Sequence, residues 1–210
     1  MFRSVGQFEY YPPCGSEGDD VTGVVIGRGT DPAYARSFLD AALHLTTEVA
    51  KPTPSAYHTL AIPALYCFRH ALELMLKAVL REVDAVLTPC PAPENEPAPP
   101  SANAARMGTH SLVEVERELT IKLQHHGYDF LIDRHRATVK RVHDLDPAGM
   151  SFRYGLNKKG QLLLPVGWEV QIREVEAAVT EVFEQLDLIW WVLQGFALSN
   201  PVGHQQMWSY

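Results

Sequence analysis

Residues 68–80 read FRHALELMLKAVL and lie within the longest helical pattern of the chain, which spans about residues 57–87. Apolar side chains recur there every three or four positions and form one wide arc on a helical wheel. Arg69 falls inside that arc, between Leu76 and Leu80. Because a buried charge without a partner is costly, Arg69 is predicted to be buried beside a carboxylate.

Glu73 and Lys77 follow Arg69 at intervals of one helical turn. Glu73 is therefore the simplest partner, although an Arg that precedes its Glu is the weaker orientation within one helix. This favours a second, tertiary partner for Arg69. His70 lies on the more polar side, near Lys77. Three interpretations stay open: a structural charge network, an anion or phosphate site built on Arg69, His70 and Lys77, or a solvated face.

Further helical patterns predict the fold class, together with one stretch, residues 151–165, where the spacing of apolar residues changes from that of a helix to that of two strands joined by a turn. Gly160 supplies the positive φ that the turn of a hairpin needs. The prediction is an all-α bundle of about five helices, with one small β-hairpin before the closing helix. Besides residues 57–87, the helices are expected at about residues 30–50, 111–125, 129–144 and 168–197, and the hairpin at residues 151–165.

The 210 residues suggest one domain with appendages. Glycine and proline punctuate residues 1–30, which we expect to be irregular, and residues 201–210 form a tail. The bundle then spans residues 31–200. Six prolines between residues 89 and 100 exclude helix and strand there, so residues 88–108 are expected to be an exposed loop inserted between helices.

Composition excludes several classes of protein. With 46% hydrophobic residues the chain is ordinary globular protein, and a net charge of -7 argues against wholesale electrostatic binding of nucleic acid, though a local basic patch is compatible with it. The three cysteines form no CxxC pair, and no signal peptide or membrane span is evident, so a cytoplasmic protein without membrane contact is expected. No Walker A loop, nucleophile elbow or zinc signature occurs, and neither a cofactor nor a metal is predicted.

The predicted helix at residues 129–144 is the most basic stretch of this acidic chain and the best candidate for an RNA or phosphate contact. Arg136 and His143 lie two turns apart on one face. An Arg that stabilises phosphorane charge and a His that moves a proton can cleave RNA without a metal. The alternative is a basic solvated face. His135 lies on the apolar arc and is expected to be a hydrogen-bonded core residue.

Two further cationic residues complete the candidate ligand-binding set. His110 precedes the capping box of Ser111 and Glu114, beside a helix N-terminus that favours anions, and is either a loop residue or part of a site. Arg153 alternates with two aromatic neighbours that we expect to pack on the bundle, leaving Arg153 outward or toward a carboxylate. The set is Arg69, His70, Glu73, Lys77, His110 and Arg153.

The closing helix carries Trp190, Trp191 and Phe196 at different angles around its axis. Only one stripe of a helix faces its own bundle, so the remaining aromatic surface needs a second cover. A two-fold interface between identical chains is the commonest solution, and a homodimer is predicted.

Three short motifs resemble HEPN-type bacterial proteins. They are FRHALELMLK at residues 68–77, THSL at 109–112, and DPAGMSFRY at 146–154 with NKKG at 157–160. The resemblance covers about residues 57–195. It implies an all-α bundle, frequent homodimerisation, and RNA- or nucleotide-directed roles in phage defence or toxin–antitoxin systems, where an antitoxin or the product of a neighbouring gene is the partner.

Active HEPN ribonucleases carry an Arg, usually a polar residue after it, and a His a few positions later on a late helix. The candidate for that pattern here is Arg136 with His143, which departs from it because Ala137 follows Arg136 in place of a polar residue. The resemblance thus favours a HEPN-like protein that binds or cleaves RNA and, if it is an enzyme, a metal-independent endoribonuclease. The alternative is a non-catalytic dimeric helical module that binds a partner protein or a nucleotide.

Overall fold

A computed structural model describes residues 32–51, 54–87, 109–154, 159–161 and 169–199 of the chain. All regular structure in these ranges is α-helical, which confirms the predicted all-α class. Each helix lies close to its predicted place in the sequence. The helices are α1 (Pro32–Val49), α2 (Pro54–Leu87), α4 (Leu112–His125), α5 (Asp133–Leu145) and α6 (Ile172–Ser199).

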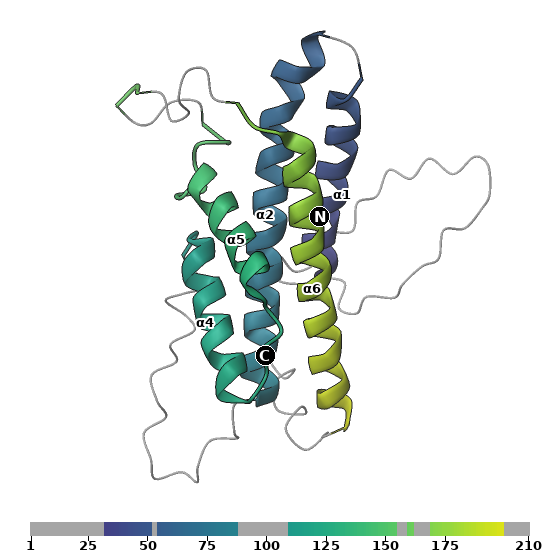
Figure 1. Cartoon of the computed structure of the whole chain (residues 1–210), viewed down its shortest axis with the longest axis vertical. Helices are drawn as coiled ribbons and strands as arrows, with labels where there is room; N and C mark the ends of the chain where they lie inside the picture. The colour runs from purple at the N-terminus through teal and green to yellow at the C-terminus, as the bar shows by residue number, and fades with distance from the viewer. Residues whose placement is uncertain (1–31, 52–53, 88–108, 155–158, 162–168, 200–210) are drawn as a thin grey trace, which may run out of the picture.

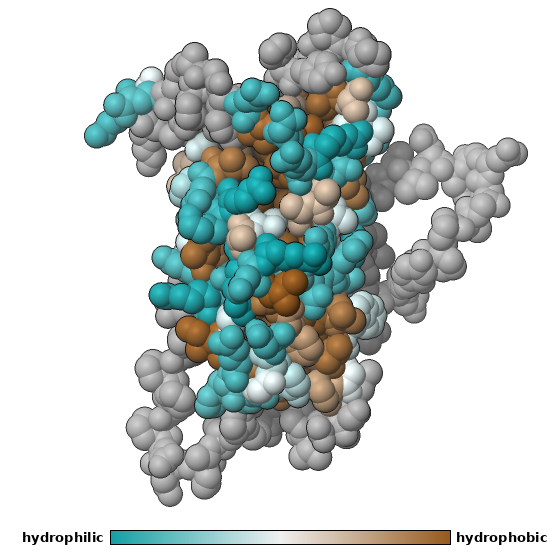
Figure 2. Space-filling view, viewed as in Figure 1, coloured by the Kyte–Doolittle hydropathy of each residue, from teal (hydrophilic) through white to brown (hydrophobic). Residues whose placement is uncertain are grey.

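Helix α2 is the centre of the bundle and contacts each of the other four described helices. Figure 1 shows α1 and α6 along one side of α2, while α4 and α5 pack against its other side. Pro63 lies inside α2, yet the helix continues through it to Leu87. An ion pair of 2.9 Å between Arg36 and Asp187 joins α1 to α6. The surface view (Figure 2) shows mostly hydrophilic residues, with hydrophobic ones gathered over the C-terminal half of α6.

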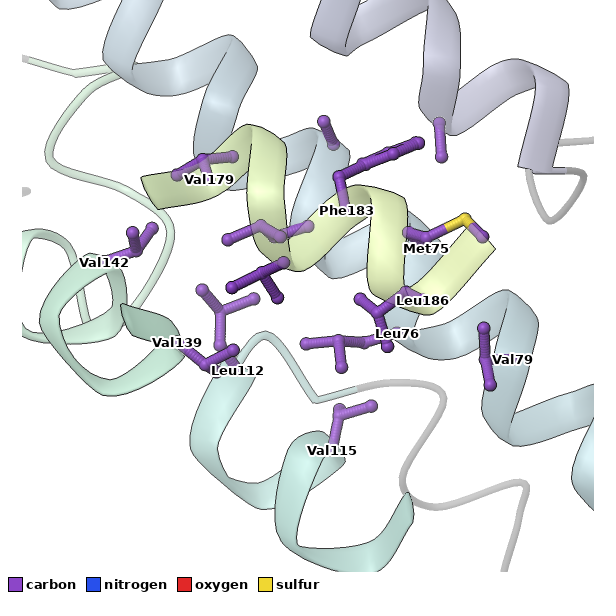
Figure 3. Packing of buried hydrophobic residues seen from close by; sticks show 14 of the residues in the cluster. Met75, Leu76, Val79, Leu112, Val115, Val139, Val142, Val179, Phe183 and Leu186 are labelled. Carbon is purple, nitrogen blue, oxygen red and sulfur yellow. The ribbon is translucent and has the colours of Figure 1, made fainter. Parts of the chain in front are cut away.

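The core is formed by the apolar arcs that the sequence predicts. Phe68 and Leu72 of α2 are completely buried, as is Phe183 of α6. Figure 3 shows Leu76 of α2 among side chains that come from α4, α5 and α6. Burial of such side chains contributes about 1.5–3 kcal/mol each, so the helices stabilise one another.

The predicted start of α4 is confirmed in part. Ser111 is the N-cap, and its hydroxyl accepts a hydrogen bond from the Glu114 amide at 3.4 Å. The reciprocal half of the capping box is replaced, because the Glu114 carboxylate accepts the hydroxyl of Thr109 at 3.0 Å. The Ser111 amide donates to the same Thr109 hydroxyl at 3.2 Å. The Thr109 hydroxyl therefore bridges the Ser111 amide and the Glu114 carboxylate, which would bond directly to each other in a capping box.

The first strand of the predicted hairpin is not present in the described residues. Residues 151–153 form turns instead, so alternation of side chains does not apply to them. The physical reason is the buried carboxylate of Asp146, which accepts the backbone amides of Met150 and Ser151 at 2.9 Å each and curls the chain around itself. Most of the remaining hairpin, including residues 155–158 and 162–165, lies outside the described residues.

The predicted irregular segment (residues 1–30), the proline-rich loop (88–108) and the tail (201–210) also lie outside the described residues. In the part of the chain that the structure describes, no helix combines the length and hydrophobicity that crossing a membrane requires.

Candidate functional site

Arg69 is buried and pairs with a carboxylate, as the sequence predicts. Its side chain is 3% exposed, and its Nη1 donates to Glu73 at 2.9 Å. The predicted tertiary partners come from two other segments of the chain. Nε donates to the carbonyl oxygen of Asp146 at 2.8 Å, and Nη2 donates to the carbonyl oxygen of His110 at 2.5 Å. One guanidinium therefore joins α2 to the residues before α4 and to those after α5.

Glu73 receives three cationic or polar side chains on its two oxygens. Oε2 accepts Arg69, while Oε1 accepts Nζ of Lys77 at 2.8 Å and faces Nδ1 of His110 at 2.8 Å. Burial alone would raise the pKa of Glu73, but hydrogen bonds and the charge of Lys77 hold that pKa at about 2. The carboxylate is therefore ionised at neutral pH and acts only as an acceptor.

Asp146 is fully buried and organises the turn that follows α5. Its carboxylate accepts the amides of Met150 and Ser151, and its Oδ2 lies 3.9 Å from Nε of Arg69. The turn includes Gly149, which has a φ of +66°. This conformation favours glycine because a side chain is strained there.

Gly149 packs directly on the guanidinium of Arg69. A Cβ built at Gly149 would lie 2.9 Å from Nη1 of Arg69, closer than side chains tolerate. The carbonyl oxygen of Gly149 accepts Nε of Arg153 at 2.8 Å. Arg69 thus binds the peptide of His110 on one side, and the turn at Gly149, which binds the guanidinium of Arg153, lies on the other.

Arg153 projects outward, which is one of its two predicted orientations. Its Nη2 lies 3.4 Å from the sulfur of Met150, and no carboxylate of the described residues pairs with it. Phe152 is buried as expected, but the prediction for Tyr154 is wrong, because that side chain is 51% exposed. The turn around Asp146 explains the difference, since neighbours in a turn do not share the alternation of a strand. The guanidinium of Arg153 lies 5.5 Å from the centre of the Tyr154 ring.

The ring of His70 lies between two aromatic rings, one from α2 and one from α1. Its ring stacks on Tyr66 with centroids 5.4 Å apart and meets Phe38 edge-on at 4.5 Å. Burial lowers the pKa of His70, and the charges of Arg69 and Arg153 lower it further against the effect of Glu73. His70 is therefore neutral near pH 7, and Arg153 lies close enough for its charge to lower the pKa of His70.

Arg136 and His143 are not brought together by the structure. Arg136 pairs with Asp129 at 3.0 Å, Asp133 at 3.2 Å and Glu116 at 3.6 Å, near the start of α5. His143 lies about 10 Å further along the axis. Its pKa is lowered by burial and by the charge of Arg69. Arg136 already forms ion pairs with three carboxylates, whereas His143 lies close enough to Arg69 for that charge to lower its pKa.

Three other basic residues of α5 contact the chain's own carboxylates, while exposed Arg141 has no carboxylate partner among the described residues. Arg134 and His135 both contact Glu181 of α6, and Lys140 pairs with Asp144. His135 is buried with its Nε2 at 3.0 Å from Glu181, which confirms the predicted hydrogen-bonded core residue. The basic character of this helix in the sequence therefore overstates its capacity to bind anions.

Asp146 and Gly149 belong to the site but are not among the site residues predicted from the sequence. The available signal was the order of the motif, in which an Asp is followed three residues later by Gly and then by Phe-Arg-Tyr. Such an Asp satisfies backbone amides of a turn whose Gly adopts positive φ. Only the fold shows that the same turn closes on Arg69.

A separate cavity of about 250 Å³ lies between α5 and the start of α6. Val142, Leu145 and Val175 line it together with Arg141 and Glu174. Its lining residues include neither Arg69 nor any residue that hydrogen-bonds to Arg69. Within the described ranges, no group of three or more His, Cys, Asp or Glu residues is placed to hold a metal ion.

Comparisons with known protein families, with curated proteins and with solved structures each found no match.

Proposed function

We propose that this chain is a HEPN-like helical protein that binds single-stranded RNA at the surface around Arg69. One observation carries the proposal. The three sequence motifs that resemble the family are far apart in the chain, yet the single guanidinium of Arg69 contacts all three. The segment at His110 and the turn that carries Arg153 are both anchored at this buried scaffold, and both side chains are exposed, so we take them as parts of one binding site.

The chemistry of the exposed groups favours RNA as the ligand. Arg153 offers a guanidinium without a carboxylate partner among the described residues, and such a group binds phosphate through two parallel hydrogen bonds. Tyr154 presents an exposed ring beside it. Unpaired bases stack on aromatic rings and on guanidinium planes, and this is how proteins usually recognise single-stranded RNA.

The net charge of -7 means that attraction is local to this surface, so binding should weaken steeply with salt.

The resemblance also supports a biological setting for this binding. HEPN-type proteins act on RNA or nucleotides in phage defence and toxin–antitoxin systems, so a cytoplasmic role with an antitoxin or neighbouring-gene partner is part of the proposal. Cleavage by Arg136 and His143 stays a prediction from the sequence. The ion pairs of Arg136 with three carboxylates do not favour it.

Fluorescence anisotropy with a labelled single-stranded RNA tests the proposed binding. Arg153→Ala should weaken the affinity about tenfold, because one charged phosphate contact contributes about 1.4 kcal/mol. Arg173→Ala is the matched control. Arg173 is exposed at the start of α6, and it forms an ion pair of 2.7 Å with Glu176 rather than with any residue that binds Arg69. Equal affinities of the wild type and of both variants would contradict the proposal.

A second candidate function, the dimeric helical module, is favoured by the outer face of α6. Leu188 and Trp191 are 55% and 63% exposed and lie one turn apart, and Phe196 is also exposed. Figure 2 shows hydrophobic residues gathered over this half of the helix. Exposed large apolar side chains in a group mark interaction sites, and we propose a second copy of the chain as the cover.

A further inference from the structure

His110 is held at two points while its ring stays open to solvent. Its carbonyl oxygen accepts Nη2 of Arg69, and its Nδ1 lies 2.8 Å from Oε1 of Glu73. The His110 side chain is nonetheless 55% exposed, whereas that of Glu73 is 4% exposed. The histidine thus combines a fixed backbone, a fixed ring edge and an accessible opposite edge.

The contact with Glu73 fixes which ring nitrogen carries the proton. A carboxylate accepts hydrogen bonds and donates none, so Nδ1 of His110 must be the protonated nitrogen. In the neutral ring, Nε2 then carries a free lone pair on the exposed side. An acidic residue that orients a histidine in this way is the arrangement by which hydrolases prepare a general base.

Lys77 and Arg69 keep the orienting carboxylate in place. Both bind Glu73 at 2.8 and 2.9 Å, and Lys77 contacts the same Oε1 that faces His110. Glu73 therefore cannot rotate away without leaving two buried or half-buried cations unpaired. The orientation of His110 is a consequence of the same charge network that stabilises the fold.

We infer that His110 is a catalytic residue, the general base of a metal-independent RNA cleavage at this surface, with Glu73 as its positioning residue. The inference rests on the proposed binding of RNA. It assigns the proton transfer to a residue outside the Arg136 and His143 pair. Arg136 is occupied by three carboxylates of its own chain, whereas Nε2 of His110 faces solvent beside the proposed binding surface.

The reaction needs no reagent besides RNA and water. Nε2 of His110 takes the proton of a ribose 2′-hydroxyl, and the 2′-oxygen forms a bond to the adjacent phosphorus. The bond from phosphorus to the 5′-oxygen of the next nucleotide breaks, and that oxygen takes a proton from water. The hydroxide left behind removes the proton from His110. The products are a 2′,3′-cyclic phosphate and a 5′-hydroxyl end.

Two oligonucleotides separate binding from cleavage. The first is a labelled single-stranded RNA of about 20 nucleotides, incubated with the full chain in EDTA and analysed on a gel. The second is the same sequence with 2′-O-methyl riboses, which lacks the reacting hydroxyl and reports binding alone. We expect the wild type to bind both and to cleave only the first.

His110→Ala and His110→Gln should lower the cleavage rate at least about 100-fold, as loss of a general base does. Both should still bind the 2′-O-methyl RNA in a salt-dependent way, because the phosphate contact of Arg153 and the ring of Tyr154 remain. Imidazole added to the solution should restore part of the rate of His110→Ala and leave the wild type unchanged. His126→Ala, an exposed histidine at the other end of α4, should cleave like the wild type.

The opposing results are distinct. Failure of the wild type to bind the 2′-O-methyl RNA would overturn the proposed function and this inference with it. Binding without cleavage, or cleavage that survives in both His110 variants, would overturn the inference and leave the proposed binding intact. Loss of cleavage in His143→Ala alone would return the assignment to the pair predicted from the sequence.

Nitrogen-15 NMR of the His110 ring tests the role of Glu73 independently of activity. The shifts of the neutral ring distinguish a proton on Nδ1 from a proton on Nε2. We expect the Nδ1-protonated form, because it donates to Glu73. A ring protonated on Nε2 would contradict the orientation on which the inference depends.

Discussion

The guanidinium of Arg69 occupies the space that a side chain at Gly149 would need, although 80 residues separate them in the chain. A Cβ built at Gly149 would lie 2.9 to 3.2 Å from three guanidinium atoms of Arg69. Hydrogen bonds to Asp146, Glu73 and His110 hold the guanidinium in place, so it cannot shift freely to admit a Cβ. The position is therefore restricted by its neighbour as well as by its φ of +66°. This contact brings the turn that carries Arg153 against α2.

Replacement of Gly149 by alanine should therefore destabilise the fold. The cost should be about 2–4 kcal/mol, because the positive φ and the clash with a buried charge add together. Gly127 is the matched control, since it has a φ of +80° and nothing within 4 Å of a built Cβ. Urea denaturation should show a larger loss for Gly149→Ala than for Gly127→Ala. Equal losses would show that the contact with Arg69 contributes nothing.

Arg69→Ala should lower the free energy of unfolding by about 2–4 kcal/mol, because Glu73 loses a partner in a site of low dielectric. The variant also leaves the carbonyl oxygens of Asp146 and His110 without their donors. Thermal and urea unfolding measure the effect, with Arg173→Ala as the control on an exposed ion pair. An unchanged melting temperature for Arg69→Ala would refute the structural role.

Acid should destabilise the protein in part through Glu73. Its pKa is 4.5 in the unfolded chain and about 2 in the fold, so the unfolded state binds the proton first. This contribution, about 3 kcal/mol, is present above pH 4.5 and is lost as the pH falls toward 2. Denaturation of the wild type and of Glu73→Gln at several pH values should show two stabilities that converge on acidification. Parallel curves would exclude the effect.

His143 and His70 add a second loss of stability as the pH falls below about 6.5. Both have folded pKa values below the usual 6.5, so the unfolded chain takes up their protons more readily. Their contribution is present above pH 6.5 and declines below it.

The outer face of α6 predicts self-association. Trp191→Glu places a charge at the centre of the exposed apolar side chains and should shift a homodimer to the monomer. Light scattering at micromolar concentration measures the mass, which for one chain is 23.5 kDa. Exposed Arg173 lies at the opposite end of the same helix, and Arg173→Ala serves as the control. A wild type that is already monomeric would rule the dimer out.

Much of the fold follows from local patterns in the sequence. The apolar arcs locate all five described helices, and the position of Arg69 between Leu76 and Leu80 predicts its burial beside Glu73. The turn at Asp146 could not be predicted, because its alternating Phe-Arg-Tyr is also the pattern of a strand. The buried carboxylate of Asp146 accepts backbone amides and so stabilises the turn rather than a strand. That carboxylate is buried only in the packed bundle, which the local pattern does not show.

The candidate site could be predicted only as a set of residues. The sequence places Arg69, Glu73 and Lys77 in one row on a helix and nominates His110 and Arg153 apart from them. Their proximity depends on three segments that meet at α2. The pair Arg136 and His143 illustrates the opposite case. Helical spacing places them on one face, but the carboxylates of Asp129 and Glu116 come from outside α5, and the pattern of α5 alone does not reveal them.

The salt dependence of RNA binding tests the central claim most directly. The affinity for a labelled single-stranded RNA should fall between about 50 and 200 mM salt, with a slope of about -0.7 for each phosphate contact. Arg153→Ala should weaken binding about tenfold and reduce the slope by about 0.7, whereas Arg173→Ala should change neither. An affinity that does not depend on salt, or a slope that is the same in Arg153→Ala, would contradict the claim that this surface binds RNA phosphate.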